Sequence, residues 1–337
     1  MPEITVIMPI YRTRPAHLKA AIESILSQQE ADFAFHILND SPEDKSLFRL
    51  VKTYRDPRIV YLENPKTLGI AKSYNRLLES ANTPYIAMMN HDDIALPTRL
   101  KRQFAYLHTH PETVLIGTAY KKFGEINRFK TVTPPLSDAK IRAMMLFKSP
   151  IHHPTIMFRR QTAIANHIRY NENYISLNDR QFYYDMGKHG TLANLAEPLY
   201  KYRFHPEMTS KTHKQQISAE QKSFHAMWFK DNYIRLSPMQ QIAFDDYAAT
   251  GRCRIKDPQT LKTVQQVLEI LSAENQKRHF APEPEFSNLC GKYLVKRCLN
   301  AAVYGKIASP EILTATPLPI RPNFLLNLAN YALSWRN

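Results

Sequence analysis

Acidic residues with the chemistry of a catalytic site follow apolar runs at three places in this sequence. Asp40 lies in a polar turn directly after one such run, and Asp92 and Asp93 lie together after another. Asp179 follows later, beside Asn178. Carboxylates can hold a divalent cation, and they can also accept a proton from a substrate hydroxyl. These residue types therefore suit metal binding and base catalysis, provided that the fold brings them together.

The apolar runs around these residues have the patterns of alternating strands and helices. Buried strands are expected at residues 4–10, 33–38, 59–62, 85–89, 114–120, 155–158 and 192–202. Helical stripes are expected at 16–28, 70–78 and 179–188. The alternation predicts an α/β domain with a mostly parallel sheet covered by helices. Ligands bind such sheets at the carboxyl ends of the strands, where the polar turns fall.

The pattern changes after residue 210. Ser237 and Asp257 each precede a proline, as an N-cap precedes proline at the first helical position. Long helical patterns follow, at residues 261–271 and 289–303. The sequence therefore predicts a catalytic α/β domain over residues 1–210 and a helical C-terminal region over 211–337.

Several enzyme classes are disfavoured by what the sequence lacks. The eight glycines cannot build GxGxxG, GxxxxGK[ST] or GxSxG. The sequence therefore disfavours three enzyme classes: dinucleotide-binding Rossmann enzymes, P-loop NTPases and α/β-hydrolases. The three cysteines, Cys253, Cys290 and Cys298, form no CxxC pair. A disulfide framework or a structural zinc site is not expected, and a reducing cytoplasm fits best.

The net charge of +15 gives the chain an attraction for polyanions. The basic residues are spread along the sequence, so an ordinary solvated basic surface explains them as well as a specific partner does. The N-terminal residues have the pattern of a strand and not of a signal peptide. No apolar run approaches the roughly 20 residues of a membrane span.

A series of short segments in a fixed order carries a family resemblance. The first strand ends in Pro9-Ile10-Tyr11, and Asp40 follows the second. The other elements, in chain order, are 65–100 with Gly69, Asn75 and the turn Asn90-His91-Asp92-Asp93, then 153–160, Asn178-Asp179, and Tyr202-Arg203-Phe204-His205 with Ser210. This series resembles the family 2 glycosyltransferases of the GT-A fold over about the first 210 residues.

The resemblance implies a nucleotide-sugar site. Asp40 matches the position that accepts a hydrogen bond from uracil, and Tyr11 would flank that base. The implied donor-binding residues are Pro9, Tyr11, Asp40, Asn75, Asn90, His91 and Asp92. Two other readings stay open, an Asx-turn for Asp40 and an interior aromatic for Tyr11.

A divalent cation is implied as well, because it neutralises the charge that develops on a leaving diphosphate. Asp92 matches the family position that touches the metal, and His205 lies where some members place a further ligand. A histidine ligand favours Mn²⁺ over Mg²⁺. The alternatives are a turn-forming role for Asp92 and a packed loop position for His205.

Asp179 matches the base of inverting members, which takes the proton of the acceptor hydroxyl. A helix N-cap is the alternative role for Asp179. Asp185 lies six residues further on and would face another side of the helix. His153 and Arg203 are the weaker candidates for contacts with the acceptor. A loop position and a simple ion pair are their respective alternatives.

Two positions depart from the family pattern. Asn90 replaces the first aspartate of the DxD motif, so the metal site is expected either to be weaker or to depend on Asp93 and His205. Asn39 replaces a frequent aspartate before Asp40. The QxxRW signature of processive synthases is missing, which favours the addition of one sugar per encounter.

The C-terminal region contains basic amphipathic patterns. Apolar residues between Phe324 and Trp335 form one helical stripe, and Lys292, Lys296 and Arg297 accompany another. One hypothesis is that these segments dock on an anionic membrane, the inner face of the bacterial cytoplasmic membrane, where a lipid-linked acceptor sits. The alternative is a stripe packed on the catalytic domain or on a partner subunit.

The sequence therefore predicts an inverting glycosyltransferase. It would move one sugar from a UDP-sugar to a hydroxyl of a glycan or lipid-linked acceptor in bacterial lipopolysaccharide, capsule or O-antigen assembly. A nucleotidyltransferase is one alternative, but the loop 11–15 lacks the glycines expected of its phosphate loop. A basic nucleic-acid-binding protein is another, but no recognised binding module is present, so no nucleic acid partner is expected. The third alternative is an inactive relative of these enzymes that binds its ligands without catalysing a reaction.

Overall fold

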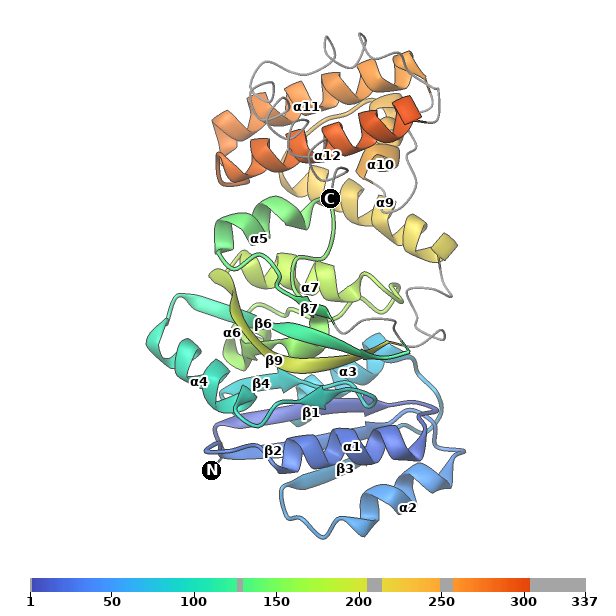
Figure 1. Cartoon of the computed structure of the whole chain (residues 1–337), viewed down its shortest axis with the longest axis vertical. Helices are drawn as coiled ribbons and strands as arrows, with labels where there is room; N and C mark the ends of the chain where they lie inside the picture. Colours follow the sequence, from blue (N-terminus) through green and yellow to red (C-terminus); the bar gives the residue numbers. More distant parts are fainter. Residues whose placement is uncertain (1, 126–129, 205–213, 249–256, 304–337) are drawn as a thin grey trace. The chain divides into compact units, whose positions relative to one another are not determined.

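The fold was described from a computed structural model, which covers residues 2–125, 130–204, 214–248 and 257–303 (Figure 1). The chain divides into two compact units. Unit 1 comprises Met1–Ile141 and Ser149–Ile217, and unit 2 comprises Arg142–Lys148 and Ser218–Asn337. The domain boundary predicted near residue 211 lies outside the described residues.

Unit 1 is built on a mixed sheet. Its strands among the described residues are β1 (Ile4–Ile10), β2 (Phe33–Asn39), β3 (Ile59–Glu63), β4 (Tyr85–Met88), β5 (Ile94–Ala95), β6 (Thr113–Gly124), β7 (Lys130–Val132), β8 (Met157–Arg159) and β9 (Thr191–Phe204). They are ordered β3-β2-β1-β4-β8-β6-β9-β5, and β7 pairs with β6. The expected α/β class is confirmed.

The direction of the strands follows the prediction in the first half of the sheet. β1 pairs in parallel with β2 and β4, and β2 pairs in parallel with β3. β8 is antiparallel to both of its neighbours, β4 and β6. The sequence placed this strand at 155–158, but His153–Thr155 forms a 3-10 turn, and the strand begins only at Met157.

Helices cover the sheet of unit 1. They are α1 (Pro15–Leu26), α2 (Lys45–Thr53), α3 (Ile70–Ser80), α4 (Arg99–Thr109), α6 (Arg160–Ala165) and α7 (Asn178–Gly187), while α5 (Asp138–Met145) contributes residues to both units. The apolar stripe predicted for α1 is buried, and its buried residues are Leu18, Ala21, Ile22 and Ile25. These side chains join the apolar residues of β1 and β2 in the core. The carboxyl ends of β1, β2 and β4 are thereby held at one edge of a packed sheet.

Gly117 on β6 occupies a position where no side chain fits. A Cβ atom at this residue would lie 2.2 Å from Asn194 Oδ1 and 2.6 Å from Ile151 Cγ2. Gly117→Ala is therefore expected to lower the free energy of unfolding by about 1–3 kcal/mol, the usual cost of overpacking a core. Chemical denaturation measures this change, with Thr131→Ala on an exposed part of β7 as the control. An unchanged midpoint for Gly117→Ala would contradict the packing described here.

Unit 2 is helical, as predicted for the C-terminal region. It contains α9 (Lys214–Asp231), α10 (Pro238–Ala248), α11 (Pro258–Arg278) and α12 (Glu285–Val303). Both predicted N-caps are confirmed: Asp257 Oδ1 accepts from Thr260 N at 2.7 Å, and Ser237 Oγ accepts from Gln240 N at 3.3 Å. Among the described residues, no helix combines the length and the apolar character needed to cross a bilayer.

The segment 142–148 belongs to the core of unit 2. The Phe147 ring stacks on Tyr293 at 4.6 Å, and Leu146 O accepts a hydrogen bond from His225 Nε2 at 3.0 Å. The other ring nitrogen of His225 lies 2.6 Å from Asp245 Oδ1. The fully buried imidazole therefore connects the 142–148 segment to α9 and α10.

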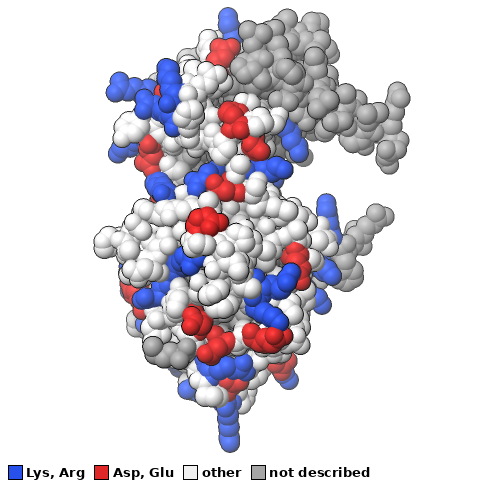
Figure 2. All heavy atoms as spheres, turned by 90° about the vertical axis from the view of Figure 1, so that its left-hand side faces the viewer, with Lys and Arg blue, Asp and Glu red and all other residues white. Residues whose placement is uncertain are grey.

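The surface charge of the molecule is distributed and mixed. On the face shown in Figure 2, basic and acidic side chains alternate over the coloured residues and form no single continuous basic surface. This view gives no support to the nucleic-acid-binding alternative, which needs clustered basic residues.

Candidate active site

The turn after β4 is anchored by a buried aspartate. The carboxylate of Asp93 accepts hydrogen bonds from Asn90 Nδ2 at 3.1 Å, Tyr200 OH at 2.9 Å and Arg203 N at 2.6 Å. Burial, together with the neighbouring Asp92 carboxylate, raises the pKa of Asp93 well above its usual value. This carboxylate is fully buried and positions the turn, and the dependence of a metal on Asp93 stays a prediction.

Arg99 supports the same turn from within the core. Its Nη2 donates to Met88 O at 2.7 Å and to Ile156 O at 3.3 Å, which ties the end of β4 to the residue before β8. The guanidinium also lies over the Tyr200 ring, 5.1 Å from its centroid. Burial lowers the pKa of Arg99 to about 10, so the side chain is charged at neutral pH.

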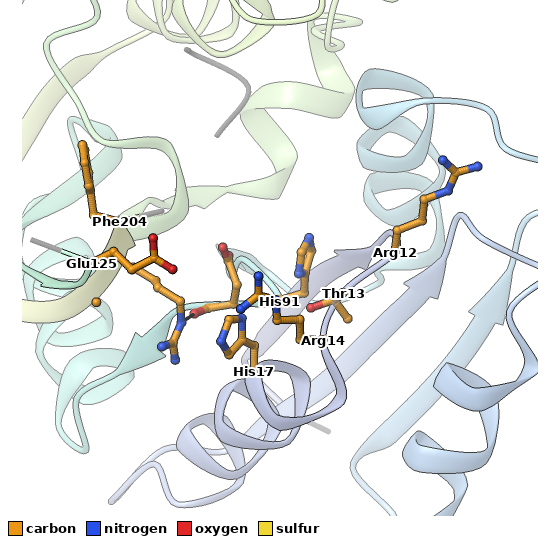
Figure 3. A pocket seen from close by; sticks show the side chains of 10 residues that line it. Arg12, Thr13, Arg14, His17, His91, Glu125 and Phe204 are labelled. Atoms are coloured by element: carbon orange, nitrogen blue, oxygen red, sulfur yellow. Dashed lines mark hydrogen bonds between the residues drawn. The ribbon is translucent and has the colours of Figure 1, made fainter. Parts of the chain in front are cut away.

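Asp92 faces a surface hollow in unit 1 (Figure 3). The residues around it are Arg12, Thr13, Arg14, His17, His91, Asp92, Gly124, Glu125, Arg203 and Phe204. In Figure 3, Arg14 and His17 lie beside His91, whereas Arg12 extends away from them. Arg203 is held in place because its Nε donates to Asp92 O at 2.7 Å. A carboxylate surrounded by arginine and histidine side chains suits a ligand that carries phosphate and a cation.

Asp40 fixes the loop that begins α3. Its Oδ1 accepts from Asn64 Nδ2 at 2.6 Å and from Leu68 N at 2.7 Å. Its Oδ2 accepts from Gly69 N at 2.9 Å, and Gly69 takes a φ of 90° just before the helix. Asp40 is 3% exposed, and among the described residues its Oδ2 accepts this one hydrogen bond. Recognition of a base by Asp40 stays a prediction.

Tyr11 lies at the surface beside the Asp40 turn. Its side chain is 41% exposed, which excludes the reading of an interior aromatic. The next residue, Arg12, donates its backbone N–H to Ser41 Oγ at 3.0 Å and so joins the ends of β1 and β2. Pro9 is buried in β1. An exposed ring at this edge of the sheet can stack on a flat ligand, and the predicted contacts of Tyr11 and Pro9 with the donor stay predictions.

Asn75 joins α3 to a distant segment. Its Nδ2 donates to Tyr170 O at 3.0 Å and to Glu172 Oε1 at 3.1 Å, and its Oδ1 accepts from Tyr170 N at 2.9 Å. Both N–H groups of the Asn75 side-chain amide thus donate to acceptors within the protein. In this conformation Asn75 positions the 170–172 segment, and its predicted contact with the donor stays untested.

Asp179 lies in the first turn of α7, half-buried. The N-cap of α7 is Leu177, so Asp179 does not fill the cap position that was the alternative. Its Oδ2 lies 3.5 Å from Ser149 Oγ. Burial raises the pKa of Asp179 to about 6. A carboxylate with a pKa near the working pH is suited to proton abstraction.

A group of aromatic rings packs around Tyr74. The Tyr74 ring packs 4.9 Å from those of His153 and Tyr170, and His153 Nε2 lies 3.0 Å from Tyr170 OH. Burial raises the pKa of Tyr74, and the negative charges of Asp179 and Asp92 raise it further.

The two adjacent histidines have different environments. His152 stacks on Tyr120 with ring centroids 4.0 Å apart, whereas His153 packs on Tyr74 and Tyr170. Burial lowers the pKa of both imidazoles to about 3, so both are neutral. The predicted contact of His153 with an acceptor stays a prediction.

Only some of the residues predicted to bind a metal lie in the described ranges. In the described ranges no three His, Cys, Asp or Glu side chains converge on one metal position. Asp92 faces the hollow, as an open site with ligands supplied by a bound diphosphate requires. The other predicted ligand, His205, lies outside the described residues.

Residues 5–168 match the family model described as glycosyl transferase family 2. Residues 5–168 belong to this family. An uncharacterized glycosyltransferase of Methanocaldococcus jannaschii is 32% identical over 186 residues, which cover 54% of this chain and 63% of the relative. The amylovoran biosynthesis glycosyltransferase AmsE of Erwinia amylovora is 29% identical over 213 residues, 61% of this chain and 78% of AmsE.

Solved structures agree on the fold. TarS of S. aureus, residues 1–349 in complex with UDP, superposes with a TM-score of 0.52 at 15% identity, over 99% of this chain and 91% of that one. The same TarS segment in complex with UDP-GlcNAc gives a TM-score of 0.54 at 14% identity, over 98% and 92%. The GT-A glycosyltransferase fold predicted from the sequence is thereby confirmed.

Sequence reasoning assigned no donor-site role to several residues of this family 2 site. Thr13, Arg14, His17 and Glu125 line the hollow with Asp92. The basic loop 11–15 was visible as a signal in the sequence. No sequence signal marked Glu125, because the pairing of β6 with β9 brings it into the site.

Proposed function

We propose that this family 2 glycosyltransferase transfers one sugar from a UDP-sugar to a hydroxyl of a glycan or lipid-linked acceptor, with inversion at the anomeric carbon. The observation that carries the proposal is that unit 1 holds two carboxylates in different environments: Asp92 lines a hollow with arginines, and Asp179 lies in the first turn of α7 with a pKa that burial raises. Relatives named for amylovoran and O-antigen biosynthesis support a bacterial surface glycan as the product.

The donor would lie along the carboxyl ends of β1, β2 and β4. The base would be recognised beside Tyr11 and Asp40, and the diphosphate would lie in the hollow of Asp92. Arg14 and Arg203 line this hollow and would bind phosphate oxygens. The titles of two TarS structures name UDP and UDP-GlcNAc as bound ligands, which supports a uridine nucleotide as the donor class.

A divalent cation fits the hollow, with Asp92 as its protein carboxylate and Mn²⁺ favoured if His205 also binds it. When bound, it supplies positive charge that stabilises the leaving UDP. Arg203 and Arg14 add to this charge from the protein side. Asp93, Tyr200 and Arg99 keep the turn in place, so Asp92 need not reorganise when the diphosphate arrives.

Asp179 would act on the acceptor. Its carboxylate takes the proton of the acceptor hydroxyl while the hydroxyl oxygen forms a bond to the anomeric carbon. The bond from that carbon to the diphosphate oxygen breaks on the opposite face, and UDP leaves. One displacement inverts the configuration, so an α-linked donor gives a β-linked product.

The proposal is tested by release of UDP from a panel of UDP-hexoses and UDP-N-acetylhexosamines, with glycolipid extracts as acceptors. The expected result is acceptor-dependent release from at least one donor, and a β-linkage in the product by NMR. An α-linkage would contradict the inverting mechanism. No release from any donor, with any extract, would contradict the UDP-sugar assignment.

A further inference from the structure

The helical unit 2 carries a groove unrelated to the catalytic residues. It is formed where α9 ends, by the turn that follows and by the last turns of α11. The residues that line it are Lys230, Tyr233, Ile234, Arg235, Ile270, Glu274 and Arg278. Two isoleucines form an apolar part, and three cations surround it.

The charges of this groove are not balanced. Glu274 accepts hydrogen bonds from Lys277 at 3.0 Å and from Arg278 at 2.8 Å, so it is already neutralised. Lys230 and Arg235 are exposed, and within the described ranges neither forms an ion pair. The neighbouring Asp231 offsets one of these charges. The groove therefore presents excess positive charge to solvent.

The most exposed large apolar side chains of the described residues lie in the same stretch of chain. Tyr233 is 74% exposed, Met239 65% and Ile242 59%, whereas no other large apolar residue in the described ranges exceeds 42%. Met239 and Ile242 are three residues apart on α10 and so share one side of that helix. The buried side of α10 is formed by other residues, Ala243, Phe244, Tyr247 and Ala248.

We propose that residues 230–242 together with Arg278, here called the basic apolar face, dock unit 2 on an anionic phospholipid surface. Exposed aromatic and aliphatic side chains beside unpaired lysine and arginine are the composition of an interfacial membrane contact. Each basic residue near an anionic surface adds about 1 kcal/mol to binding. The face lies in described residues and is separate from the stripe between Phe324 and Trp335, which lies outside them.

A second copy of the chain fits this face less well. A two-fold dimer would place the same patch of each subunit against the other. The excess positive charge of the groove would then be brought against the same charge on the other subunit as both are desolvated. An anionic membrane instead neutralises these cations while it accepts Tyr233, Met239 and Ile242.

The test is flotation of the full chain with vesicles of phosphatidylcholine alone and of phosphatidylcholine with phosphatidylglycerol, at low and high salt. The parent is expected to float with the anionic vesicles and to be released by salt. The double variant Lys230→Gln with Arg235→Gln is expected to bind about 30-fold more weakly, since two basic contacts are lost. Lys262→Gln with Lys292→Gln removes two exposed charges elsewhere in unit 2 and is the matched control.

A second pair of variants tests the apolar part. Met239→Ser with Ile242→Ser removes exposed side chains, so folding is expected to be unchanged by circular dichroism, while flotation is lost. Equal flotation of both double variants and the control would overturn the proposal. The proposal would also be overturned if the parent sedimented as a dimer without vesicles and the variants abolished that dimer, because the face would then bind a second copy.

Deletion of residues 321–337 is expected to leave the salt-sensitive vesicle binding in place. Loss of vesicle binding on this deletion would assign the contact to the C-terminal stripe. Flotation does not depend on sugar transfer, so its result stands apart from the proposed activity.

Discussion

Replacing Asp179 with asparagine is expected to lower kcat for sugar transfer by about 10²–10⁴-fold, the usual contribution of a positioned general base. Asparagine is nearly isosteric but cannot accept the acceptor proton. UDP binding is expected to be unchanged, because Asp179 lies on α7 and the donor turns lie after β1, β2 and β4. Single-turnover transfer and UDP affinity, measured on the same preparation, separate the two effects.

The pH dependence of the parent gives an independent test of this role. Burial raises the pKa of Asp179 to about 6, and the base must be ionised to act. Transfer is therefore expected to increase as the pH rises through about 6 and then to level off. The raised pKa also means that the folded state binds this proton more tightly than the unfolded state, so the ionised carboxylate costs stability at neutral pH. Asp179→Asn is thus expected to unfold at a temperature no lower than the parent.

Asp185→Asn is the matched control on the same helix. Asp185 pairs with Lys188 at 3.0 Å at the surface, an interaction of small energetic value. Its replacement is expected to leave both kcat and the pH profile intact. If Asp179→Asn kept full activity, or if both variants lost activity equally, Asp179 would not be the base.

Asp92→Ala is expected to lower kcat/KM by about 10³-fold and to remove the dependence of transfer on the divalent cation. Asp92 is the aspartate of the turn that faces the hollow, and its loss leaves the cation without its proposed protein carboxylate. Titration of the parent and the variant with Mn²⁺ at fixed donor concentration measures the change. The thermal midpoint is expected to change little, since Asp92 is partly exposed.

Two variants show whether this loss is specific. Glu125→Gln removes a different carboxylate from the same hollow and is expected to keep the Mn²⁺ dependence. Asp93→Ala is expected to lower the thermal midpoint instead, because it breaks the hydrogen bonds to Tyr200 and Arg203. An Asp92→Ala variant with the metal dependence of the parent would show that the cation, if any, is bound elsewhere.

The elements around the site could be predicted because their signals are local. The strands before Tyr11, Asp40 and Asn90 are apolar runs that end in polar residues, and the structure places those ends at one edge of the sheet. Both helix caps of unit 2, Ser237 and Asp257, were equally visible from the proline that follows each.

The roles of the buried polar residues could not be predicted, because their partners are distant in sequence. The family resemblance singled out Asp92 for the metal, but no local signal showed that Asp93 would hold the turn in place. That role depends on hydrogen bonds from Tyr200 and Arg203, which are about 110 residues away in the sequence. Asn75 likewise acquires its role from the segment 170–172. The same reason explains the segment 142–148, whose residues pack with helices that begin about 70 to 140 residues later in the chain.

Calorimetric titration of the parent with UDP and with GDP, in Mn²⁺ and in chelator, tests the central claim most directly. The account predicts binding of UDP in Mn²⁺, much weaker binding of UDP in chelator, and weaker binding of GDP under both conditions. Absence of UDP binding in both conditions, or a preference for GDP, would contradict the assignment of this family 2 enzyme to UDP-sugar donors.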